Sequence, residues 1–338
     1  MFSDSYRALR EVAAIGAVAP RTAIGISGKD RAAYLQGLLT NDVEALEAGT
    51  GCYSAWLTPQ GRMLTDLHIL ESGDMILLDV PVGVGAATLQ RLDQFLFSED
   101  VQFADLSAAL TSVWVHGPQA GAILERVLSL DAARAFTARE SLNDWAEYQN
   151  ARAEFSGSPV VVARVSQLGV PGFCVYAEAS RAEDLKQALQ AAGATLADPG
   201  VIETARIEAG YPLFGVDMTE DTIPLEAGIE GRAISLTKGC YVGQEVIIRV
   251  LHRGQGRVAR KLIALRLAGD PPARGAKIWS GDREIGFVTS AAPASHSGAV
   301  ALGYVHRDFV EPGTRVEIDS GGGRTAGLVS ERPIPVGA

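Results

Sequence analysis

The stretch Lys238–Glu245 carries the densest set of reactive side chains in the chain. It reads Lys-Gly-Cys-Tyr-Val-Gly-Gln-Glu and places a thiol, an amine, an amide and a carboxylate beside two glycines. Lys238 stands two positions before Cys240, and a nearby amine lowers the pKa of a thiol and favours the thiolate, the nucleophilic and metal-binding form. Most free cysteines are instead small buried hydrophobes. The residues alone therefore leave two hypotheses: a functional thiol, or a tightly packed turn.

The two other cysteines, Cys52 and Cys174, stand in apolar stretches that predict strands. Burial there raises the pKa of a thiol and blunts its reactivity. The three cysteines are far apart and form neither a disulfide framework nor a four-thiolate iron–sulfur site. The five histidines show no H-x-x-x-H spacing, so we predict no resident metal. This cysteine usage fits a reducing, cytoplasmic compartment.

The motif Lys238–Glu245 resembles the signature of the YgfZ family, folate-binding iron–sulfur cluster proteins related to the glycine-cleavage T-protein. Val246–Arg249 and the following His-Arg-Gly also resemble that family. Residues 206–228 are similar to the pterin-binding region of the T-protein superfamily through R-x-E-x-G and P-x-E-x-G elements. Leu35–Val43 is similar to the superfamily element L-x-x-L-x-x-N-D-V. The likeness therefore runs from about residue 20 to the C-terminal strands.

This resemblance implies a tetrahydrofolate site. Glu208 and Glu226 are the candidates for the pterin ring, because a buried carboxylate accepts paired N–H donors from its 2-amino pyrimidinone edge. Leaving such donors unpaired would cost about 1–3 kcal/mol each. The sequence leaves open which glutamate contacts the ring. We also assign Tyr241, Gln244 and Asp66 to the folate site, although single aromatic residues such as Tyr241, Tyr211 and Phe214 are more often core.

The glutamate tail of tetrahydrofolate requires a local basic site, because the chain has a formal net charge of −10. Guanidinium groups bind carboxylates with two parallel hydrogen bonds. The candidates are Arg206, Arg232, Arg249 and Arg253, of which we assign Arg206 and Arg249 to the site. For each of them a surface ion pair is an equally good explanation.

One position departs from the T-protein pattern. Gly61–Leu67 falls where T-proteins carry G-G-x-x-D-D-L, and Thr65 replaces the first Asp. In T-proteins that Asp is the carboxylate near the reacting folate nitrogens. A hydroxyl cannot replace a carboxylate as a base or as a negative charge at neutral pH. We therefore expect a folate pocket without aminomethyl transfer.

The leading hypothesis from the resemblance is a tetrahydrofolate-binding factor for assembly or repair of iron–sulfur clusters, with Cys240 as functional thiol beside Lys238. Its partners would be iron–sulfur assembly proteins and cluster-containing client enzymes. A folate-dependent one-carbon transferase or demethylase is the alternative, against which Thr65 speaks. A folate-binding regulatory module is a third possibility, but binding alone would not need the complete motif 238–245.

Length and composition limit the other classes of protein. A chain of 338 residues with 47% hydrophobic residues indicates a globular protein of two or three domains. No apolar run reaches the ~18 residues of a membrane-spanning helix, and the N-terminus lacks the pattern of a secretory signal. The negative charge argues against a general nucleic-acid or anionic-membrane surface. We expect neither nucleic acid nor membrane as a partner.

The pattern of elements predicts an α+β protein. Residues 20–110 and 111–210 mix strands and helices in similar proportion, which is compatible with an internal duplication, whereas the glycine-rich residues 210–255 show little periodicity. From about 257, short apolar runs between turn signals predict a small β-barrel. We predict α+β units at 1–110 and 111–255 and a barrel at 256–338, which the resemblance implies are arranged around a central channel. The predicted helices span 27–39 with Ser27 as N-cap, 89–96, 118–128, 181–192 with Ser180 as cap, and 199–209.

Overall fold

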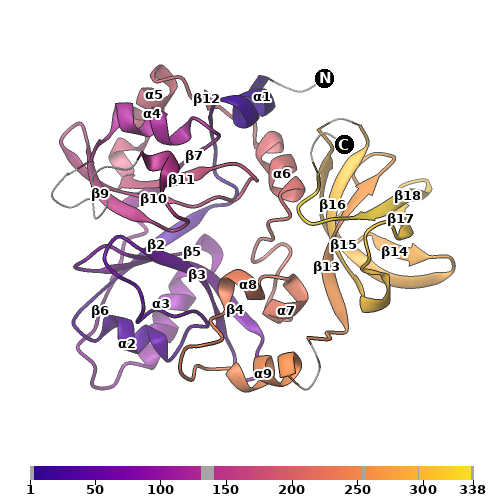
Figure 1. Cartoon of the computed structure of the whole chain (residues 1–338), viewed down its shortest axis with the longest axis horizontal. Coiled ribbons are helices and arrows are strands. Elements are labelled where there is room, and N and C mark those ends of the chain that lie inside the picture. Colours follow the sequence, from indigo (N-terminus) through magenta and orange to yellow (C-terminus); the bar gives the residue numbers. More distant parts are fainter. Residues whose placement is uncertain (1–3, 131–140, 253–255, 296, 336–338) are drawn as a thin grey trace.

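The computed structural model describes residues 4–130, 141–252, 256–295 and 297–335. Their strands form a five-stranded sheet, a seven-stranded sheet and a closed barrel. Figure 1 shows the two sheets one above the other, with the barrel beside them and helices α6, α7 and α8 between. The predicted fold class, mixed α and β structure with a C-terminal barrel, is confirmed.

The first sheet is antiparallel, with the order β3-β4-β5-β2-β6. Its strands are β2 (Arg21–Ser27), β3 (Gly51–Leu57), β4 (Met63–Glu71), β5 (Ile76–Pro81) and β6 (Gln102–Asp105). The helices α2 (Arg31–Gln36) and α3 (Gly85–Gln94), the latter preceded by the 3₁₀ turn η1 (Val82–Val84), cover one face. Their leucines pack there against Ile24, Trp56 and Ile69.

The second sheet has the order β12-β1-β7-β11-β10-β9-β8. Its strands are β1 (Ala14–Ile15), β7 (Leu110–His116), β8 (Ser129–Leu130), β9 (Asn150–Phe155), β10 (Ser158–Arg164), β11 (Gly172–Glu178) and β12 (Thr195–Leu196). The helices α4 (Ala120–Val127) and α5 (Ala182–Ala191) cover one face, with η2 (Leu142–Asp144) and η3 (Ala179–Arg181) beside them. Helix α1 (Asp4–Glu11) precedes β1, so the N-terminus contributes a strand to this sheet.

The two sheets repeat one order of elements. Each has an opening strand (β2 or β7), a helix, an antiparallel three-strand meander (β3–β5 or β9–β11), a 3₁₀ turn with a helix, and a closing strand (β6 or β12). In each, the last strand of the meander pairs with the opening strand. This repetition is compatible with the internal duplication considered from the sequence, and β1 and β8 are additions in the second sheet.

The segment between the second sheet and the barrel contains four helices among its described residues: α6 (Pro199–Glu208), α7 (Pro224–Ala227), α8 (Glu230–Ala233) and α9 (Gln244–His252). Three of these helices, α7, α8 and α9, interrupt the stretch 210–255, in which the sequence predicted no helix, and the other described residues of that stretch lie outside the helices and strands. Helices α7 and α8 are too short to show a periodic pattern in the sequence. Pro224 begins α7 and Gly228, in the left-handed conformation, ends it.

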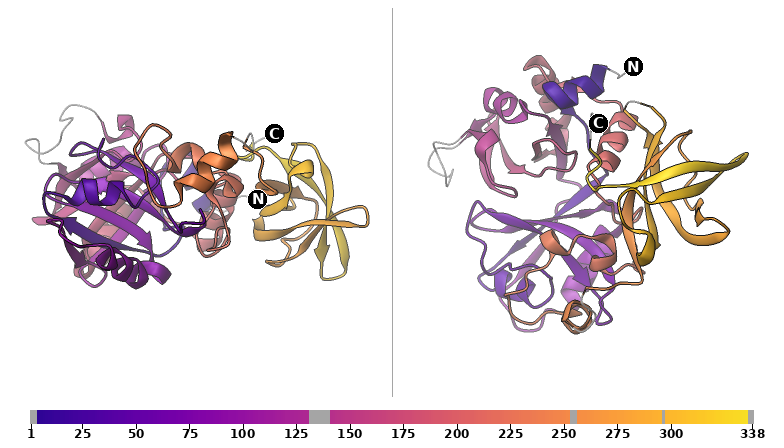
Figure 2. Two further views of the ribbon diagram at one scale, coloured as in Figure 1. Left: turned by 90° about the horizontal axis from the view of Figure 1, so that it is seen from below. Right: turned by 45° about the vertical axis from the view of Figure 1, so that its right-hand side comes forward.

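The barrel closes in the order β13-β16-β15-β14-β17-β18. Its strands are β13 (Arg260–Leu267), β14 (Lys277–Ser280), β15 (Arg283–Pro293), β16 (Ala299–His306), β17 (Arg315–Ser320) and β18 (Gly323–Ser330), with η4 (Arg307–Phe309) after β16. Figure 2 shows the barrel projecting to one side of the two sheets. Helix α6 joins it to them, because Ile207 packs among barrel residues such as Leu262 and Tyr304.

Local capping explains where the predicted helices shift. Helix α2 begins at Arg31, because Ser27 ends β2 and Asp30 takes the N-cap position. Ser180 lies in η3 instead of capping α5. Asp198 caps α6 as predicted, since its carboxylate accepts the N–H of Gly200 at 2.7 Å. No helix in the described part of the chain is long and apolar enough to cross a membrane.

Candidate functional site

The signature stretch 238–245 is docked on the first unit, by which we mean the first sheet with its helices α2 and α3. The N–H of Ser235 donates to the carbonyl of Thr40 at 3.0 Å, and the N–H of Val242 donates to that of Gly37 at 3.3 Å. The hydroxyl of Thr40 donates to the carbonyl of Ala233 at 2.6 Å. Two motifs that lie 200 residues apart in the sequence, the stretch 35–43 and the signature, therefore form one structure.

Lys238 is the main anchor of this contact. Its ammonium group donates to the carbonyls of Gln36 and Leu39, each at 2.6 Å, and to that of Asn41 at 2.9 Å. These oxygens lie at and after the end of α2, where a helix leaves carbonyls without partners. Burial lowers the pKa of Lys238 to about 8. The charge of Lys238 acts to lower the pKa of the Cys52 thiol. Its three hydrogen bonds go to backbone carbonyls, and not to Cys240 as the sequence had suggested.

Two glycines permit the close approach of the signature to the turn between β3 and β4. Gly243 has a φ of +87°, and a Cβ there would lie 2.5 Å from the carbonyl oxygen of Thr58. Gly61 has a φ of +75°, and a Cβ there would lie 2.9 Å from the Cβ of Val246. Both positions need a left-handed backbone and no side chain. By contrast, a Cβ on Gly239 would meet nothing within 4 Å.

The three thiols differ in exposure. Cys240 is exposed, Cys52 is half-buried and Cys174 is buried. Burial raises the pKa of the Cys52 thiol to about 12, against a smaller lowering by Lys238. Burial also raises the pKa of Cys174 well above its usual value. Among the described residues, no group of three His, Cys, Asp or Glu side chains could hold a metal.

A buried polar network lies between the two sheets and includes Asp66. One carboxylate oxygen of Asp66 accepts from Tyr53 at 2.9 Å, and the other accepts from Arg21 at 3.3 Å. Arg21 also donates to Asp79 at 2.6 Å, and the hydroxyl of Tyr176 donates to Asp79 at 2.5 Å. Burial acts to raise the pKa of Asp79, but Arg21, His68 and Tyr176 together outweigh it and the pKa is lowered. The network links the first sheet to the second.

His68 extends this network towards the helices of the connecting segment. Its Nε2 pairs with the hydroxyl of Tyr211 at 3.1 Å, and its Nδ1 lies 3.5 Å from the carboxylate of Asp79. Burial, and then the charge of Arg21, lower the pKa of His68, so the ring is neutral. The side-chain amide of Gln167 donates to the same tyrosine hydroxyl at 3.4 Å.

Arg232 lies at the end of the network with an unused donor. Its guanidinium carbon is 4.4 Å from the ring centre of Tyr53 and 4.2 Å from that of Tyr211. Its Nη2 is buried and, among the described residues, has no hydrogen-bond partner. The Oε1 of Gln167 is likewise buried without a partner in the described part of the chain. Such groups are rare in folded proteins and indicate a bound molecule or water.

The two glutamates of the predicted pterin site already have hydrogen-bond partners on α1 and in the barrel. Glu208, at the end of α6, is buried and accepts from the hydroxyl of Tyr6 at 2.5 Å, from Arg10 at 2.8 Å and from the N–H of Ser295 at 3.3 Å. Glu226, on α7, is partly buried and accepts from Arg260 at 3.2 Å. Glu208 therefore joins α1, α6 and the barrel.

The two arginines assigned to the folate tail occupy different settings. Arg206 is fully buried, and its Nε, Nη1 and Nη2 atoms all donate within the chain, to Glu203, Asp217 and the carbonyl of Tyr211. Arg249 is exposed on α9 and pairs with Glu245 at 3.0 Å. Arg253 lies outside the described residues. The contacts of Arg206 are those of a structural ion-pair residue, which the sequence pattern could not distinguish from a ligand-binding one.

Tyr241 and Gln244 follow Cys240 in the signature. Tyr241 is buried, its ring lies 5.2 Å from the ammonium of Lys238, and its hydroxyl has no hydrogen-bond partner among the described residues. Burial raises the pKa of Tyr241 to about 12. Gln244 begins α9, and its N–H donates to the carbonyl of Tyr241 at 3.2 Å.

Two models of protein families match this chain. The model described as the GCVT N-terminal domain matches residues 1–238, and that described as the glycine cleavage T-protein C-terminal barrel domain matches residues 260–334. The chain belongs to the glycine cleavage T-protein family. The predicted relationship to T-proteins is thereby confirmed, and the narrower resemblance to the YgfZ family stays a prediction.

Relatives of known name extend over nearly the whole chain. The aminomethyltransferase of Rippkaea orientalis is 28% identical over 342 residues, which are 98% of this chain and 88% of that protein. The aminomethyltransferase of Desulforamulus reducens is 29% identical and covers 93% of this chain and 84% of its own length. The crystal structure of the glycine cleavage system aminomethyltransferase T from Bartonella henselae has a TM-score of 0.83 at 23% identity, covering 97% of this chain and 88% of that one. At that identity the structural likeness shows the shared fold.

Thr65 stands where the T-protein pattern G-G-x-x-D-D-L has its first Asp. It pairs with Trp56 across β3 and β4, and Trp56 belongs to the core under α2 and α3. Cross-strand partners share a face of the sheet, so Thr65 faces this core. Its hydroxyl donates to the carbonyl of Asp66 at 3.1 Å. Asp66, opposite Ala55, lies on the other face, where Arg21 and Tyr53 already hold its carboxylate.

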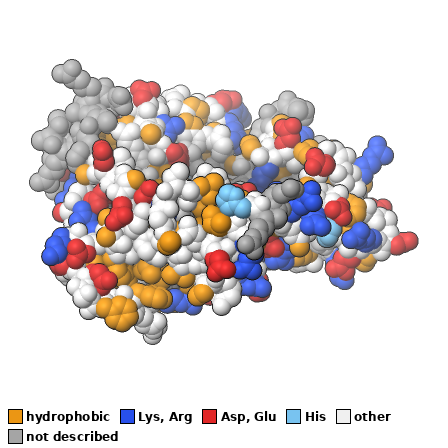
Figure 3. Space-filling model, turned by 60° about the horizontal axis from the view of Figure 1, so that its bottom comes forward, with side chains coloured by type: hydrophobic (Ala, Val, Ile, Leu, Met, Phe, Trp, Pro, Cys, Tyr) orange, Lys and Arg blue, Asp and Glu red, His pale blue; other side chains and the backbone are white. Residues whose placement is uncertain are grey.

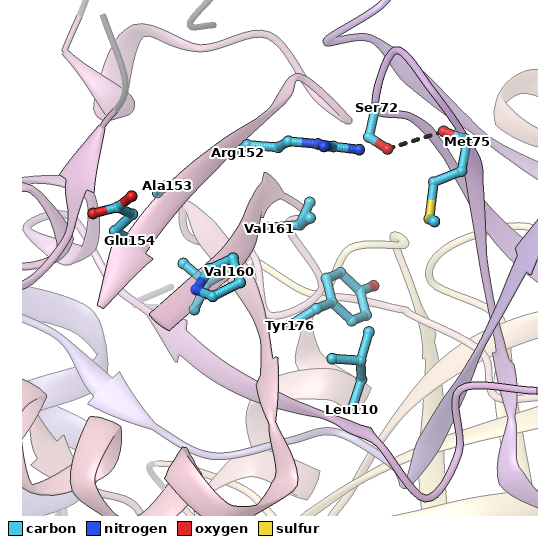
Figure 4. A pocket seen from close by; sticks show the side chains of 10 residues that line it. Ser72, Met75, Leu110, Arg152, Ala153, Glu154, Val160, Val161 and Tyr176 are labelled. Carbon is cyan, nitrogen blue, oxygen red and sulfur yellow. Dashed lines mark hydrogen bonds between the residues drawn. The ribbon is translucent and has the colours of Figure 1, made fainter. Parts of the chain in front are cut away.

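A cleft of about 260 Å³ lies where the first unit of this T-protein family member meets the second. Figure 4 shows Met75 of the first unit across from Tyr176, Val161 and Leu110 of the second, with Arg152 above them. Arg152 pairs with Asp74. A second cleft of about 260 Å³ lies between the barrel and residues 216–222, with Arg260, Tyr304 and Phe287 among its lining residues. Neither cleft was predicted, because each is built from side chains of separate units.

The sequence analysis missed most of the buried network. Arg21, Tyr53, His68 and Asp79 were not assigned, although a charged or polar residue inside an otherwise apolar strand gives a signal. Asp79 follows Ile-Leu-Leu in β5, and His68 stands between Leu67 and Ile69 in β4. Such residues are seldom buried unless they are paired. Only the order of the strands reveals which of them are partners.

Proposed function

We propose that this chain binds tetrahydrofolate beside Tyr53, Tyr211 and Arg232. The observation that supports it is the buried pair of unused groups, the Nη2 of Arg232 and the Oε1 of Gln167, in two side chains that both contact Tyr211. A pterin edge offers N–H donors and a carbonyl acceptor, which fit one unused acceptor and one unused donor. The tyrosine rings would stack on its plane. Tetrahydrofolate, when bound, supplies a carrier of one-carbon groups.

Titration calorimetry and thermal unfolding with tetrahydrofolate test this site. We expect saturable binding, with a stabilisation of roughly 2.7 kcal/mol at 100 times the dissociation constant. Gln167→Leu and Arg232→Leu should weaken binding at least tenfold, while Arg315→Ala, at an exposed position of β17 in the barrel, should not. Absence of any shift at millimolar ligand, or equal binding by all three variants, would contradict the proposed site.

For the cellular role, we propose assembly or repair of iron–sulfur clusters in client enzymes, with Cys240 as reactive or transient ligand thiol. Two observations support this role. Cys240 is the exposed thiol in a docked, glycine-shaped loop, and the position of the T-protein carboxylate holds Thr65, whose side chain faces the core of the first unit. A thiolate in an accessible loop can bind a metal or attack an electrophile. A cytoplasmic location is part of this proposal.

The second candidate is a folate-dependent one-carbon transferase or demethylase. The names of the curated relatives favour it, because proteins called aminomethyltransferases align with nearly the whole chain. An assay of methylene-tetrahydrofolate formation from an aminomethylated carrier protein separates the two candidates. We expect no turnover, because no carboxylate stands at position 65. Turnover at the rate of a genuine T-protein would establish the second candidate and remove the first.

A further inference from the structure

The turn after α3 displays an aromatic side chain to solvent. The side chain of Phe97 is 85% exposed and that of Phe95 is 44% exposed. Single exposed hydrophobic residues are common on protein surfaces, whereas aromatic residues that are exposed close together are frequent anchors of protein interfaces. In Figure 3, which brings forward the end of the molecule with α9, hydrophobic side chains gather at the lower left edge.

This turn is held in one conformation by its own hydrogen bonds. The carboxylate of Glu99 accepts the N–H groups of Phe97 at 3.0 Å and Ser98 at 2.9 Å. The N–H of Asp100 donates to the carboxylate of Asp30 at 2.8 Å. A side chain displayed on a fixed turn loses little conformational freedom when a partner binds. The turn is therefore built to present Phe97 and does not merely leave it exposed.

The second unit shows that the fold does not require these aromatic residues. Helix α5 holds the place of α3 in the repeated order of elements, and the residues that follow it are Ala192, Gly193 and Ala194. The sequence after α3 is instead Phe-Leu-Phe-Ser-Glu-Asp. The corresponding helix α5 ends without any aromatic residue. Phe95 and Phe97 are therefore not needed to end α3.

Acidic side chains surround the turn. Asp93, Glu99 and Asp100 are exposed, and Asp30 lies against them. Backbone N–H groups of the turn lower the pKa of Glu99, so its carboxylate is charged at neutral pH. Lys29 and Arg31 flank Asp30 in the sequence, Arg31 pairs with Glu71 at 3.1 Å, and Arg91 at the end of α3 is offset by Glu220 at 3.8 Å. An apolar tip within a negative rim complements a positively charged surface and is repelled by anionic lipid.

We infer that Phe97, Phe95 and the acidic turn form a docking surface for a partner protein that presents an apolar pocket rimmed by lysine or arginine. The ring of Phe95 lies 6.3 Å from that of Trp56, and Val242, two residues after Cys240, packs on the same core cluster. A partner that covers Phe97 therefore binds the sheet and helices on which the signature loop is docked. The inference does not depend on folate binding.

Photo-crosslinking in the native host tests this surface, with p-benzoylphenylalanine placed at position 97 of the full chain. The matched control places it at Leu196, whose side chain is 58% exposed on the second unit. We expect a protein adduct from position 97 that position 196 does not give, and that Asp93→Asn weakens. Adducts of the chain with a second copy of itself or with lipid, or the same adducts from both positions, would overturn the inference.

Binding of the crosslinked protein, purified and titrated against the full chain, completes the test. Phe97→Ala should weaken the complex at least tenfold, and Leu196→Ala should leave it unchanged. The affinity of the parent should fall with added salt, and Asp93→Asn should reduce that dependence. Stabilisation by tetrahydrofolate should be equal in all of these variants, which separates this surface from the folate site. Equal affinity of Phe97→Ala and the parent would refute the inference.

Discussion

At the scale of single residues, Lys238 shows how a motif can combine two roles. Its position beside Cys240 in the sequence favoured an effect on that thiol. Its ammonium group instead holds three carbonyls of the first unit. Different residues of the signature therefore have different roles. Lys238, Gly243 and Tyr241 hold the loop in place, whereas the thiol of Cys240 is exposed.

Lys238→Met should destabilise the protein, because it leaves three carbonyls at the end of α2 without their charged donor. Hydrogen bonds to charged groups contribute more than neutral ones, and we expect a loss of roughly 2–4 kcal/mol in the free energy of unfolding. Urea titration followed by circular dichroism gives this value. Lys186→Met is the control, since Lys186 is exposed and pairs with Glu183 at 3.5 Å on the surface of α5. Equal stability of the two variants would refute the anchoring role.

Alkylation should modify the three thiols in the order of their accessibility. Iodoacetamide on the folded protein, read by mass spectrometry, should label Cys240 first. Cys52 and Cys174 should react only on unfolding, because burial raises the pKa of both thiols. Labelling of Cys52 or Cys174 ahead of Cys240 would leave Cys240 without the role proposed here. Cys240→Ala should unfold at the same urea concentration as the parent, since an exposed side chain contributes little to stability.

At the scale of elements, the glycines of the signature differ in what the fold asks of them. Gly243→Ala should lower the free energy of unfolding by roughly 1–3 kcal/mol, because φ is positive there and the new Cβ would collide with the carbonyl of Thr58. Gly239→Ala, in the same motif, should change it by less than about 0.5 kcal/mol, since open space surrounds that position. Urea titration of both variants tests the difference. A larger effect at position 239 would show that the loop packs in another way.

The elements could be predicted from the sequence where they have a period and a clear end. The barrel strands alternate between turn signals, and Asp198-Pro199 marks the start of α6. The prediction of a long helix from Ser27 was wrong, because Gly28 lies against the carbonyl of Asp100 and that tertiary contact decides where β2 ends. Helix α9 was missed although Val246, Ile247, Val250 and Leu251 have helical spacing. The surrounding glycines dominated the interpretation of that segment.

The site was less predictable than the fold, for a reason that lies in the topology. The resemblance to T-proteins led to the two motifs that touch each other, at 35–43 and 238–245. It could not show that Arg21, Asp66 and Asp79 share one buried network, because they lie on three strands whose order the sequence does not state. It also could not separate Arg206, whose three nitrogen atoms all donate hydrogen bonds, from Arg232, whose Nη2 has no partner among the described residues.

At the scale of the whole molecule, buried histidines between and within the sheets make stability depend on pH. His116 is fully buried and stacks on Trp114 with ring centres 5.9 Å apart. Burial lowers its pKa to about 4, and burial together with Arg21 lowers that of His68. An unfolded histidine has a pKa of about 6.5. Below that pH the unfolded chain binds a proton that the folded chain excludes, so acid favours unfolding.

The contribution of the buried histidines to the free energy of unfolding should therefore be constant above about pH 7.5 and fall as the pH drops from about 6.5 to 4. For His116 alone the loss over this range is about 3 kcal/mol, since each unit of pKa corresponds to about 1.4 kcal/mol. The lowered pKa of Asp79 adds a further loss only at pH values below the usual range of a carboxyl group. Urea titrations at half-unit steps of pH measure the slope. His116→Leu should remove its share of the slope between pH 6.5 and 4. A flat profile in the parent over this range would mean that water or a proton reaches the buried rings and that the sheets are packed less tightly than the contacts of His116 and His68 require.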